Sequence, residues 1–181
     1  MQVNITFRHL EPTAALKAYA REKVEHIQRY VDRATDAHVV LYVENLEHKV
    51  DINLKAGPFL VRGEAKSEDM YASIDLATDK IERQLKKHKE KLKDHKVATP
   101  ANGWKPVEVR HEVFDFQKHP SDRVVKSKTF EAKPMSLDEA ILQMDLMNGS
   151  FFVFQNASDR AINVVYKRDD GNLGLIEARA P

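Results

Sequence analysis

Residues 67–93 read SEDMYASIDLATDKIERQLKKHKEKLK, and this segment sets the architecture of the N-terminal half of the chain. Ser67 or Asp69 is suited to cap a helix, because a short side-chain oxygen there accepts a hydrogen bond from a free backbone amide. The segment predicts a long amphipathic helix with an apolar stripe that must be buried against another layer. The stripe consists of Met70, Ile74, Ala77, Ile81, Leu85 and Leu92.

The residues before this helix show strand and helix patterns in turn. Apolar residues at every second position, and runs rich in Val, Leu and Tyr, are typical of strands, with Gly63 as a candidate bulge. Thr13 precedes apolar residues at helical spacing and is suited to cap that helix. The order β-α-β-β-β-α predicts one sheet with both helices on one face, similar to the layout of double-stranded RNA-binding domains. The predicted elements are strands at 2–8, 38–43, 50–55 and 59–66 and a helix at 14–31.

A second folded unit is predicted in the C-terminal third of the chain. Ser136, with Glu139 three residues later, has the form of a capping box that opens a helix. The predicted order is β-α-β-β-β, with strands at 124–130, 151–154, 162–166 and 173–177. We therefore expect an α+β chain with a first domain at 1–95, a linker at 96–121 and a small C-terminal dimerisation domain at 122–181.

The composition excludes several classes of protein. The 181 residues are 42% hydrophobic and 31% charged, which is typical of a folded soluble protein rather than a disordered one. No apolar run is long enough to span a membrane, and no secretory signal opens the chain, so we expect a cytoplasmic protein without membrane contacts. The absence of cysteine excludes disulfides and thiolate metal sites.

Signals for catalysis are weak. The eight histidines are scattered, and the string that begins His111-Glu112 has Asp115 where a zinc-protease helix needs its second histidine. No glycine-rich phosphate loop and no nucleophile elbow is present. We therefore expect no enzyme activity, metal, cofactor or small-molecule substrate. A metal-dependent hydrolase is kept as a third hypothesis.

Positive charge is concentrated on the second helix, although the net charge of the whole chain is only +1. Lys80, Arg83, Lys87 and Lys91 fall between about 200° and 280° from Ile81 on a helical wheel, a spacing that can follow a phosphate backbone. Lys23 belongs to a further basic group on the first helix, and side-by-side helices predict one positive groove. The alternative is an ordinary solvated face whose charge is offset by acids.

The run Phe151-Phe152-Val153-Phe154 is apolar on both faces of its predicted strand, because successive side chains point to opposite sides. A unit of about 60 residues has one helix to cover one face, so the other face needs a partner. Homodimerisation is the favoured interpretation. The alternative is a strand buried wholly within the chain.

Several strings resemble one known family. Residues 68–75 (EDMYASID) and 80–85 (KIERQL) resemble the second helix of the ribosome hibernation-promoting factor and ribosome-associated inhibitor A family. The strings at 130–135 (FEAKPM), 139–144 (EAILQM), 151–154 (FFVF), 163–166 (NVVY) and 174–177 (GLIE) resemble the extra C-terminal domain of its long form. The resemblance covers both folded units and leaves the linker unmatched.

This resemblance implies a non-catalytic function in translation. The N-terminal domain is expected to bind 16S rRNA between the head and body of the small ribosomal subunit and to block messenger and transfer RNA. The C-terminal domain is expected to pair two ribosomes in stationary phase or stress. The resemblance also shows a departure at His26, where relatives often carry lysine. The runner-up hypothesis is a regulator that binds double-stranded RNA in general.

The residues expected to contact RNA are Lys23, Lys80, Arg83, Lys86, Lys87 and Lys91. The residues expected at the dimer interface are Phe151, Phe152, Phe154, Val164 and Tyr166.

Overall fold

The computed structural model describes residues 1–31, 34–90, 107–114 and 124–178. The chain divides into two compact units, one of Met1–Val97 with Leu142–Ser150 and the other of Ala98–Ile141 with Phe151–Pro181. Each unit combines helices with a four-stranded sheet, so the predicted α+β class is confirmed.

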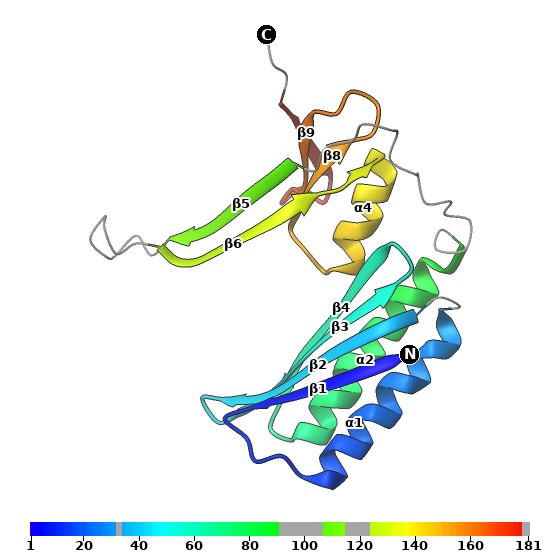
Figure 1. Cartoon of the computed structure of the whole chain (residues 1–181), viewed down its shortest axis with the longest axis vertical. Coiled ribbons are helices and arrows are strands. Elements are labelled where there is room, and N and C mark those ends of the chain that lie inside the picture. Colours follow the sequence, from blue (N-terminus) through cyan, green and yellow to red (C-terminus); the bar gives the residue numbers. More distant parts are fainter. Residues whose placement is uncertain (32–33, 91–106, 115–123, 179–181) are drawn as a thin grey trace. The chain divides into compact units, whose positions relative to one another are not determined.

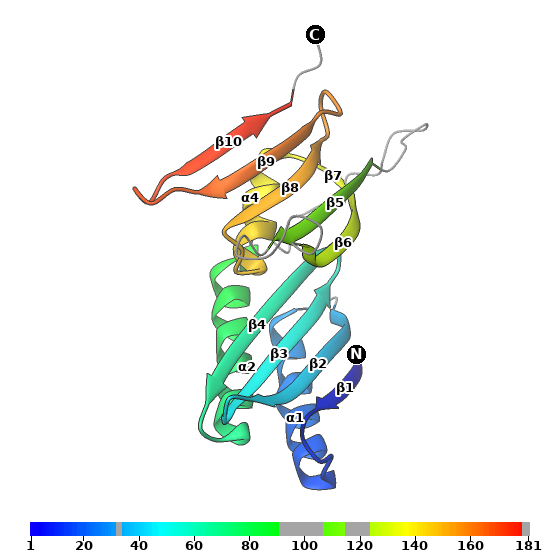
Figure 2. The same cartoon turned by 90° about the vertical axis from the view of Figure 1, so that its left-hand side faces the viewer.

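The first unit has the predicted order of strands and helices. Its sheet runs β1-β2-β3-β4, with β1 parallel to β2 and the other pairs antiparallel. Figures 1 and 2 show α1 and α2 side by side on one face of this sheet. The elements are β1 (Gln2–Arg8), α1 (Ala14–His26), the 3-10 turn η1 (Ile27–Tyr30), β2 (Ala34–Glu44), β3 (Glu47–Ala56), β4 (Phe59–Ser67) and α2 (Met70–Lys87).

The core of this unit lies between the sheet and α2. Alternate residues of β2 and β3 point toward the helices, and the apolar stripe of α2 covers them. Burying these side chains stabilises the fold by about 1.5–3 kcal/mol for each large one. The members that have no exposed surface include Val39, Leu41, Ile52, Leu54, Ile74, Ala77, Ile81 and Leu85. Leu92, the last predicted member of the stripe, lies outside the described residues.

Both helices of this unit begin at side-chain caps. Thr13 Oγ1 accepts a hydrogen bond from the Leu16 amide at 3.2 Å, and an Asp69 carboxylate oxygen accepts one from the Ala72 amide at 2.8 Å. Asp69 is therefore the cap, whereas the Ser67 hydroxyl donates to the Asp69 carbonyl oxygen. Such caps contribute about 1 kcal/mol each.

Gly63 is not a bulge, contrary to the sequence prediction. It pairs with Ile52 in an unbroken antiparallel register, and the register shift of this sheet lies in β2 between Ala34 and Asp36. A Cβ at Gly63 would lie 2.6 Å from the Ala77 carbonyl oxygen and 2.6 Å from Ile81 Cγ1. The position requires glycine because α2 packs directly on the backbone of β4.

The second unit also contains a four-stranded sheet, in the order β10-β9-β8-β7, and a separate ribbon of β5 and β6. The capping box is confirmed, since the Glu139 amide donates to Ser136 Oγ and the Ser136 amide to the Glu139 carboxylate. Figures 1 and 2 show α4 against one face of the sheet. The elements are β5 (Val107–Phe114), β6 (Val124–Ala132), β7 (Pro134–Met135), α4 (Leu137–Leu146), β8 (Phe151–Asn156), β9 (Ile162–Lys167) and β10 (Leu173–Glu177). Helix α4 begins in this unit, and its residues from Leu142 onward belong to the first unit.

The first predicted strand of this unit has a different partner from the one expected. Residues 124–130 lie in β6, which pairs with β5, while the two-residue β7 completes the sheet beside β8. Strand β5 lies inside the interval predicted as a linker. Its Val109 lies opposite Phe130, so this part of the interval forms a strand by pairing with a segment distant in the sequence. The remaining predicted linker residues lie outside the described ranges.

Replacing Gly63 with alanine should destabilise the first unit. The added methyl group must push α2 away from β4, and overpacking of this kind costs about 1–3 kcal/mol. Urea unfolding followed by circular dichroism measures the loss. Glu64→Ala, on the opposite face of the same strand, is the control and should change the unfolding free energy by no more than about 0.5 kcal/mol. An unchanged urea midpoint for Gly63→Ala would show that the contact between α2 and β4 can accept a methyl group without loss of stability.

Candidate functional site

Three cations of the predicted RNA-binding set lie on the side of α2 away from α1, and Lys80 among them contacts β4. Lys80, Arg83 and Lys87, here called the basic stripe, are all exposed. The Lys87 ammonium lies 3.5 Å from an Asp145 carboxylate oxygen. The Lys80 ammonium donates to the Glu64 carbonyl oxygen of β4 at 2.6 Å, and Arg83 Nε donates to the Asp79 carbonyl oxygen at 3.3 Å. These hydrogen bonds leave donors of both side chains available, since an ammonium has three and a guanidinium five.

Two other predicted RNA contacts lie on the side of α2 that faces α1, and they are engaged within the chain. The Lys86 ammonium lies 3.5 Å from Glu82 and 4.7 Å from the centre of the Tyr30 ring. The Lys23 ammonium lies 2.8 Å from Asp75 and 5.1 Å from the centre of the Tyr19 ring. Lys91 lies outside the described residues. The predicted set is therefore divided, and only the basic stripe shares one surface.

Lys23, Asp75 and Tyr19 form a hydrogen-bonded group between the helices. The Tyr19 hydroxyl lies 2.9 Å from both Asp75 carboxylate oxygens, to which it donates. The hydrogen bond to Asp75, followed by that to Tyr19, raises the pKa of Lys23. Burial, and then the hydrogen bond to Asp75, raises the pKa of the Tyr19 hydroxyl. Lys23 therefore stays protonated, with its charge directed at Asp75.

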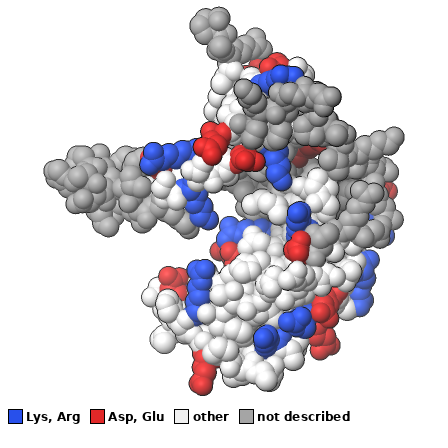
Figure 3. All heavy atoms as spheres, in the orientation of Figure 1, with Lys and Arg blue, Asp and Glu red and all other residues white. Residues whose placement is uncertain are grey.

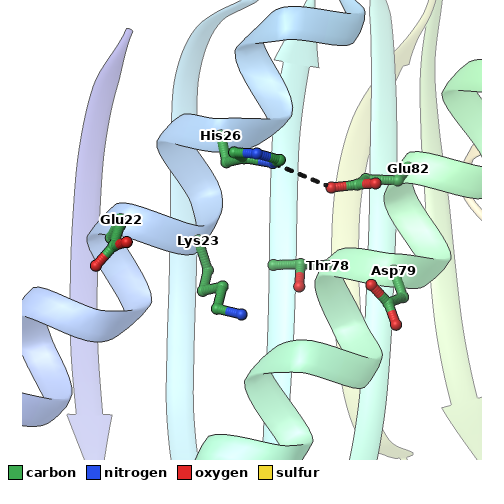
Figure 4. Close-up of a pocket in the computed structure, with 6 residues that line it drawn as sticks. All are labelled: Glu22, Lys23, His26, Thr78, Asp79 and Glu82. Atoms are coloured by element: carbon green, nitrogen blue, oxygen red, sulfur yellow. Dashed lines mark ion pairs between the residues drawn. The ribbon is translucent and has the colours of Figure 1, made fainter.

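A cavity of about 330 Å³ lies between α1 and α2 (Figure 4). Three carboxylates and one ammonium line it, and His26 Nδ1 lies 3.4 Å from a Glu82 carboxylate oxygen. The prediction of one positive groove between the helices is therefore wrong, because the basic stripe lies on the other side of α2. The lining residues are Glu22, Lys23, His26, Thr78, Asp79 and Glu82.

The surface charge agrees with this mixed arrangement. Figure 3 shows Lys and Arg side chains intermingled with Asp and Glu on the face that it displays. On the outer face of the first sheet, Arg62 pairs with Asp51 at 2.8 Å and with Glu64 at 3.0 Å. Pairing of this kind removes most of the local field, so a surface rich in charge does not by itself attract RNA.

The second unit has one sheet face that is apolar and only partly covered, since the His111 ring of β5 lies 6.1 Å from the Phe151 ring between centroids. Cross-strand register forms two rows over β8, β9 and β10. One row is Phe151, Tyr166 and Gly174, and the other is Val153, Val164 and Ile176. Phe151 is 49% exposed and Ile176 is 56% exposed. We call Phe151, Val153, Val164, Tyr166 and Ile176 the open sheet face.

The opposite face of the same strands is the one that α4 covers. Phe154 is fully buried and Val165 is 1% exposed, as expected beneath a helix whose Ala140 is also fully buried. Of the predicted interface residues, Phe151, Val164 and Tyr166 lie on the open sheet face. Phe152 and Phe154 lie on the covered face, and the prediction of Phe154 as an interface residue is wrong because the side chain belongs to the core.

Two members of the open sheet face, Val153 and Ile176, were not among the predicted interface residues. The alternation of the strands carries the signal for both, since Val153 is two positions from Phe151 and Ile176 lies opposite Val164. Glycine at 174 lets the Tyr166 ring lie over the backbone of β10, where a Cβ would overlap the ring.

The described segments offer little for metal chemistry or membrane insertion. No group of three or more His, Asp or Glu side chains in them is arranged to hold a metal ion. None of the helices described is long and apolar enough to cross a membrane.

Comparisons with known proteins match both units. Residues 3–93 match the family described as Sigma 54 modulation protein / S30EA ribosomal protein, and residues 119–175 match the C terminus described for the same family. Two solved structures are similar over about half of the chain. A ribosomal subunit interface protein from Coxiella burnetii is 30% identical, with a TM-score of 0.47, and covers 50% of this chain and 99% of its own. The Thermus thermophilus Protein Y N-terminal domain is 34% identical, with a TM-score of 0.45, and covers 48% and 98%.

Curated relatives match almost from end to end. A ribosome hibernation promotion factor from Bacillus subtilis is 39% identical over 186 residues, which cover 98% of each chain. Proteins with the same name from Deinococcus radiodurans and Lactococcus lactis are each 34% identical, and they cover 97% and 98% of this chain and 98% of their own. The chain therefore belongs to the S30EA ribosomal protein family, in the form that carries both the N-terminal and the C-terminal domain and includes the ribosome hibernation promotion factors.

Proposed function

We propose that this protein is a ribosome hibernation factor, which enters the decoding channel of the small subunit, excludes messenger and transfer RNA, and joins two inactive ribosomes. The observation that carries this proposal is the end-to-end match to proteins named ribosome hibernation promotion factor. Inhibition then needs no catalytic group, because a protein that occupies the channel blocks translation by its volume. The protein acts in the cytoplasm, in stationary phase or stress.

The basic stripe is the proposed contact with 16S rRNA. Lys80 and Lys87 lie two turns apart, about 10 Å along α2, a spacing that can follow successive phosphates of one strand. Lys23 and Lys86 are proposed as secondary contacts, because they lie between the two helices beside Asp75 and Glu82, away from the basic stripe. Lys91 continues the stripe in the sequence.

The open sheet face is the proposed surface for homodimerisation. A face with Phe151 and Ile176 about half exposed is shielded from water when a second copy covers it, which favours association. A small unit with a thin core also gains much of its stability from such association. Pairing of two copies through this face would join two small subunits, each held by one N-terminal unit.

Replacing Lys80, Arg83 and Lys87 together with alanine should weaken binding to purified small subunits by at least tenfold. The slope of the logarithm of the association constant against the logarithm of the salt concentration should also become shallower, by about 0.7–0.9 for each phosphate that is no longer neutralised. Co-sedimentation at several salt concentrations measures both effects. The control is Lys128→Ala with Lys167→Ala and Arg168→Ala, which removes the same charge from the second unit. Equal weakening in both triple variants would show that net charge, and not the basic stripe, determines binding.

A generic RNA duplex should not displace the wild type from small subunits. Displacement would favour a regulator that binds double-stranded RNA in general.

Charged substitutions on the open sheet face should separate pairing from binding. Val164→Asp with Ile176→Asp places two carboxylates where a second copy must exclude water, so ribosome pairs should disappear from sucrose gradients. Co-sedimentation with single small subunits should stay unchanged. Asn172→Asp, in the β9–β10 turn, adds charge off this face and should still give ribosome pairs. Pairs that persist in the double variant would place the interface elsewhere.

A further inference from the structure

The tip of the β2–β3 hairpin carries a leucine that is almost entirely in water. Leu46 is 92% exposed, more than any other large hydrophobic residue that the structure describes. Single exposed leucines are common on protein surfaces, and exposure alone indicates nothing. The backbone at Leu46 makes this position unusual.

Leu46 lies in a conformation that favours glycine. Glu44 pairs with Glu47, so the turn consists of Asn45 and Leu46 alone, with φ angles of 52° and 64°. Positive φ at both central positions defines a type I′ turn, for which Asn-Gly is the preferred dipeptide. Asn45 fits this preference and Leu46 does not, because its Cβ crowds the backbone in the left-handed region. So little of the Leu46 side chain is buried that packing does not compensate for this strain.

The charges around the turn are balanced by ion pairs. The Lys49 ammonium lies 2.6 Å from Glu44 and 3.7 Å from Glu47, and the Lys66 ammonium lies 2.8 Å from Glu47. Two carboxylates therefore meet two ammonium groups, which leaves no excess of positive charge for phosphates. Asn45 and Leu46 also provide no aromatic ring on which a base can stack. The chemistry of the tip suits an apolar pocket on a protein rather than RNA.

We propose that the β2–β3 turn is a second contact with the small ribosomal subunit, in which Leu46 enters an apolar pocket on a ribosomal protein. This inference rests on the proposed function for the identity of the target. Figure 1 shows the turn at the end of the sheet, where two strands paired over ten positions hold it. The backbone of the turn is thus held in place, so binding there orders only the leucine side chain and costs little backbone entropy.

Leu46→Gly should move stability and binding in opposite directions. The variant contains Asn45 followed by glycine, so its thermal midpoint should rise by a few degrees. Its affinity for small subunits should fall by about 10- to 100-fold, because the variant has no leucine side chain to bury. Leu46→Met keeps an apolar side chain of similar volume and should retain wild-type affinity. Leu173→Ala, an exposed leucine of the second unit, should also bind as the wild type does.

A photo-cross-linking residue identifies the class of partner. Leu46→p-benzoylphenylalanine, irradiated in complex with small subunits and analysed by mass spectrometry, should give a cross-link to a ribosomal protein. A cross-link to rRNA or to a second copy of the chain, or unchanged affinity of Leu46→Gly, overturns the inference and leaves the proposed function intact. Failure of the wild type to bind small subunits overturns both.

Discussion

Helix α2 lies directly on the backbone of β4 because Gly63 has no side chain to hold it away. The Ala77 carbonyl oxygen and the Ile81 side chain occupy the space that a Cβ would take. This close approach fixes the rotation of α2 about its own axis, since Ile81 must point at Gly63. Once that rotation is fixed, the direction of every other side chain on the helix follows from 100° per residue. The basic stripe is then directed toward the β4 side, and Asp75, Asp79 and Glu82 toward α1.

The separation of charge on α2 makes the proposed RNA contact compatible with a net charge of only +1. Two contacts join α1 to α2: Lys23 lies 2.8 Å from Asp75, and His26 lies 3.4 Å from Glu82. Lys86 pairs with Glu82 of its own helix at 3.5 Å. The basic stripe on the far side takes no part in this contact with α1, and of its members Lys87 pairs with Asp145 at 3.5 Å. One flank of α2 thereby packs against α1, and the other carries the cations proposed to contact RNA.

Most of the first unit could be predicted because its signals are local. A period of two in the strands and of 3.6 in the helices identifies which side chains are buried, and Thr13 and Asp69 mark where the helices begin. A helical wheel also shows that Lys80 and Glu82 lie on different flanks of α2. It does not show which flank faces α1, and the predicted positive groove failed for that reason. Gly63 was misread because strand patterns contain no information on how closely a helix approaches.

The second unit was harder to predict because its key contacts are distant in the sequence. The alternation of Phe151 to Phe154 correctly indicated that one face would be covered and one left open. Which face α4 covers depends on the path of the chain between helix and sheet, so Phe154 was assigned to the surface although it is fully buried. Strand β5 went unrecognised because Val109 needs Phe130, 21 residues later, as its partner.

Leu46 and the open sheet face share one property: each leaves apolar surface in water. At Asp69 and Gly63, local pattern, backbone conformation and burial agree, as expected where a residue serves stability alone. At Leu46 an apolar side chain stays in water on a backbone that prefers glycine, and at Ile176 more than half of the side chain surface remains exposed. Neither arrangement stabilises the isolated chain. Both become favourable if another surface covers them. Residues whose conformation or exposure does not stabilise the isolated chain are therefore candidates for contacts with its partners.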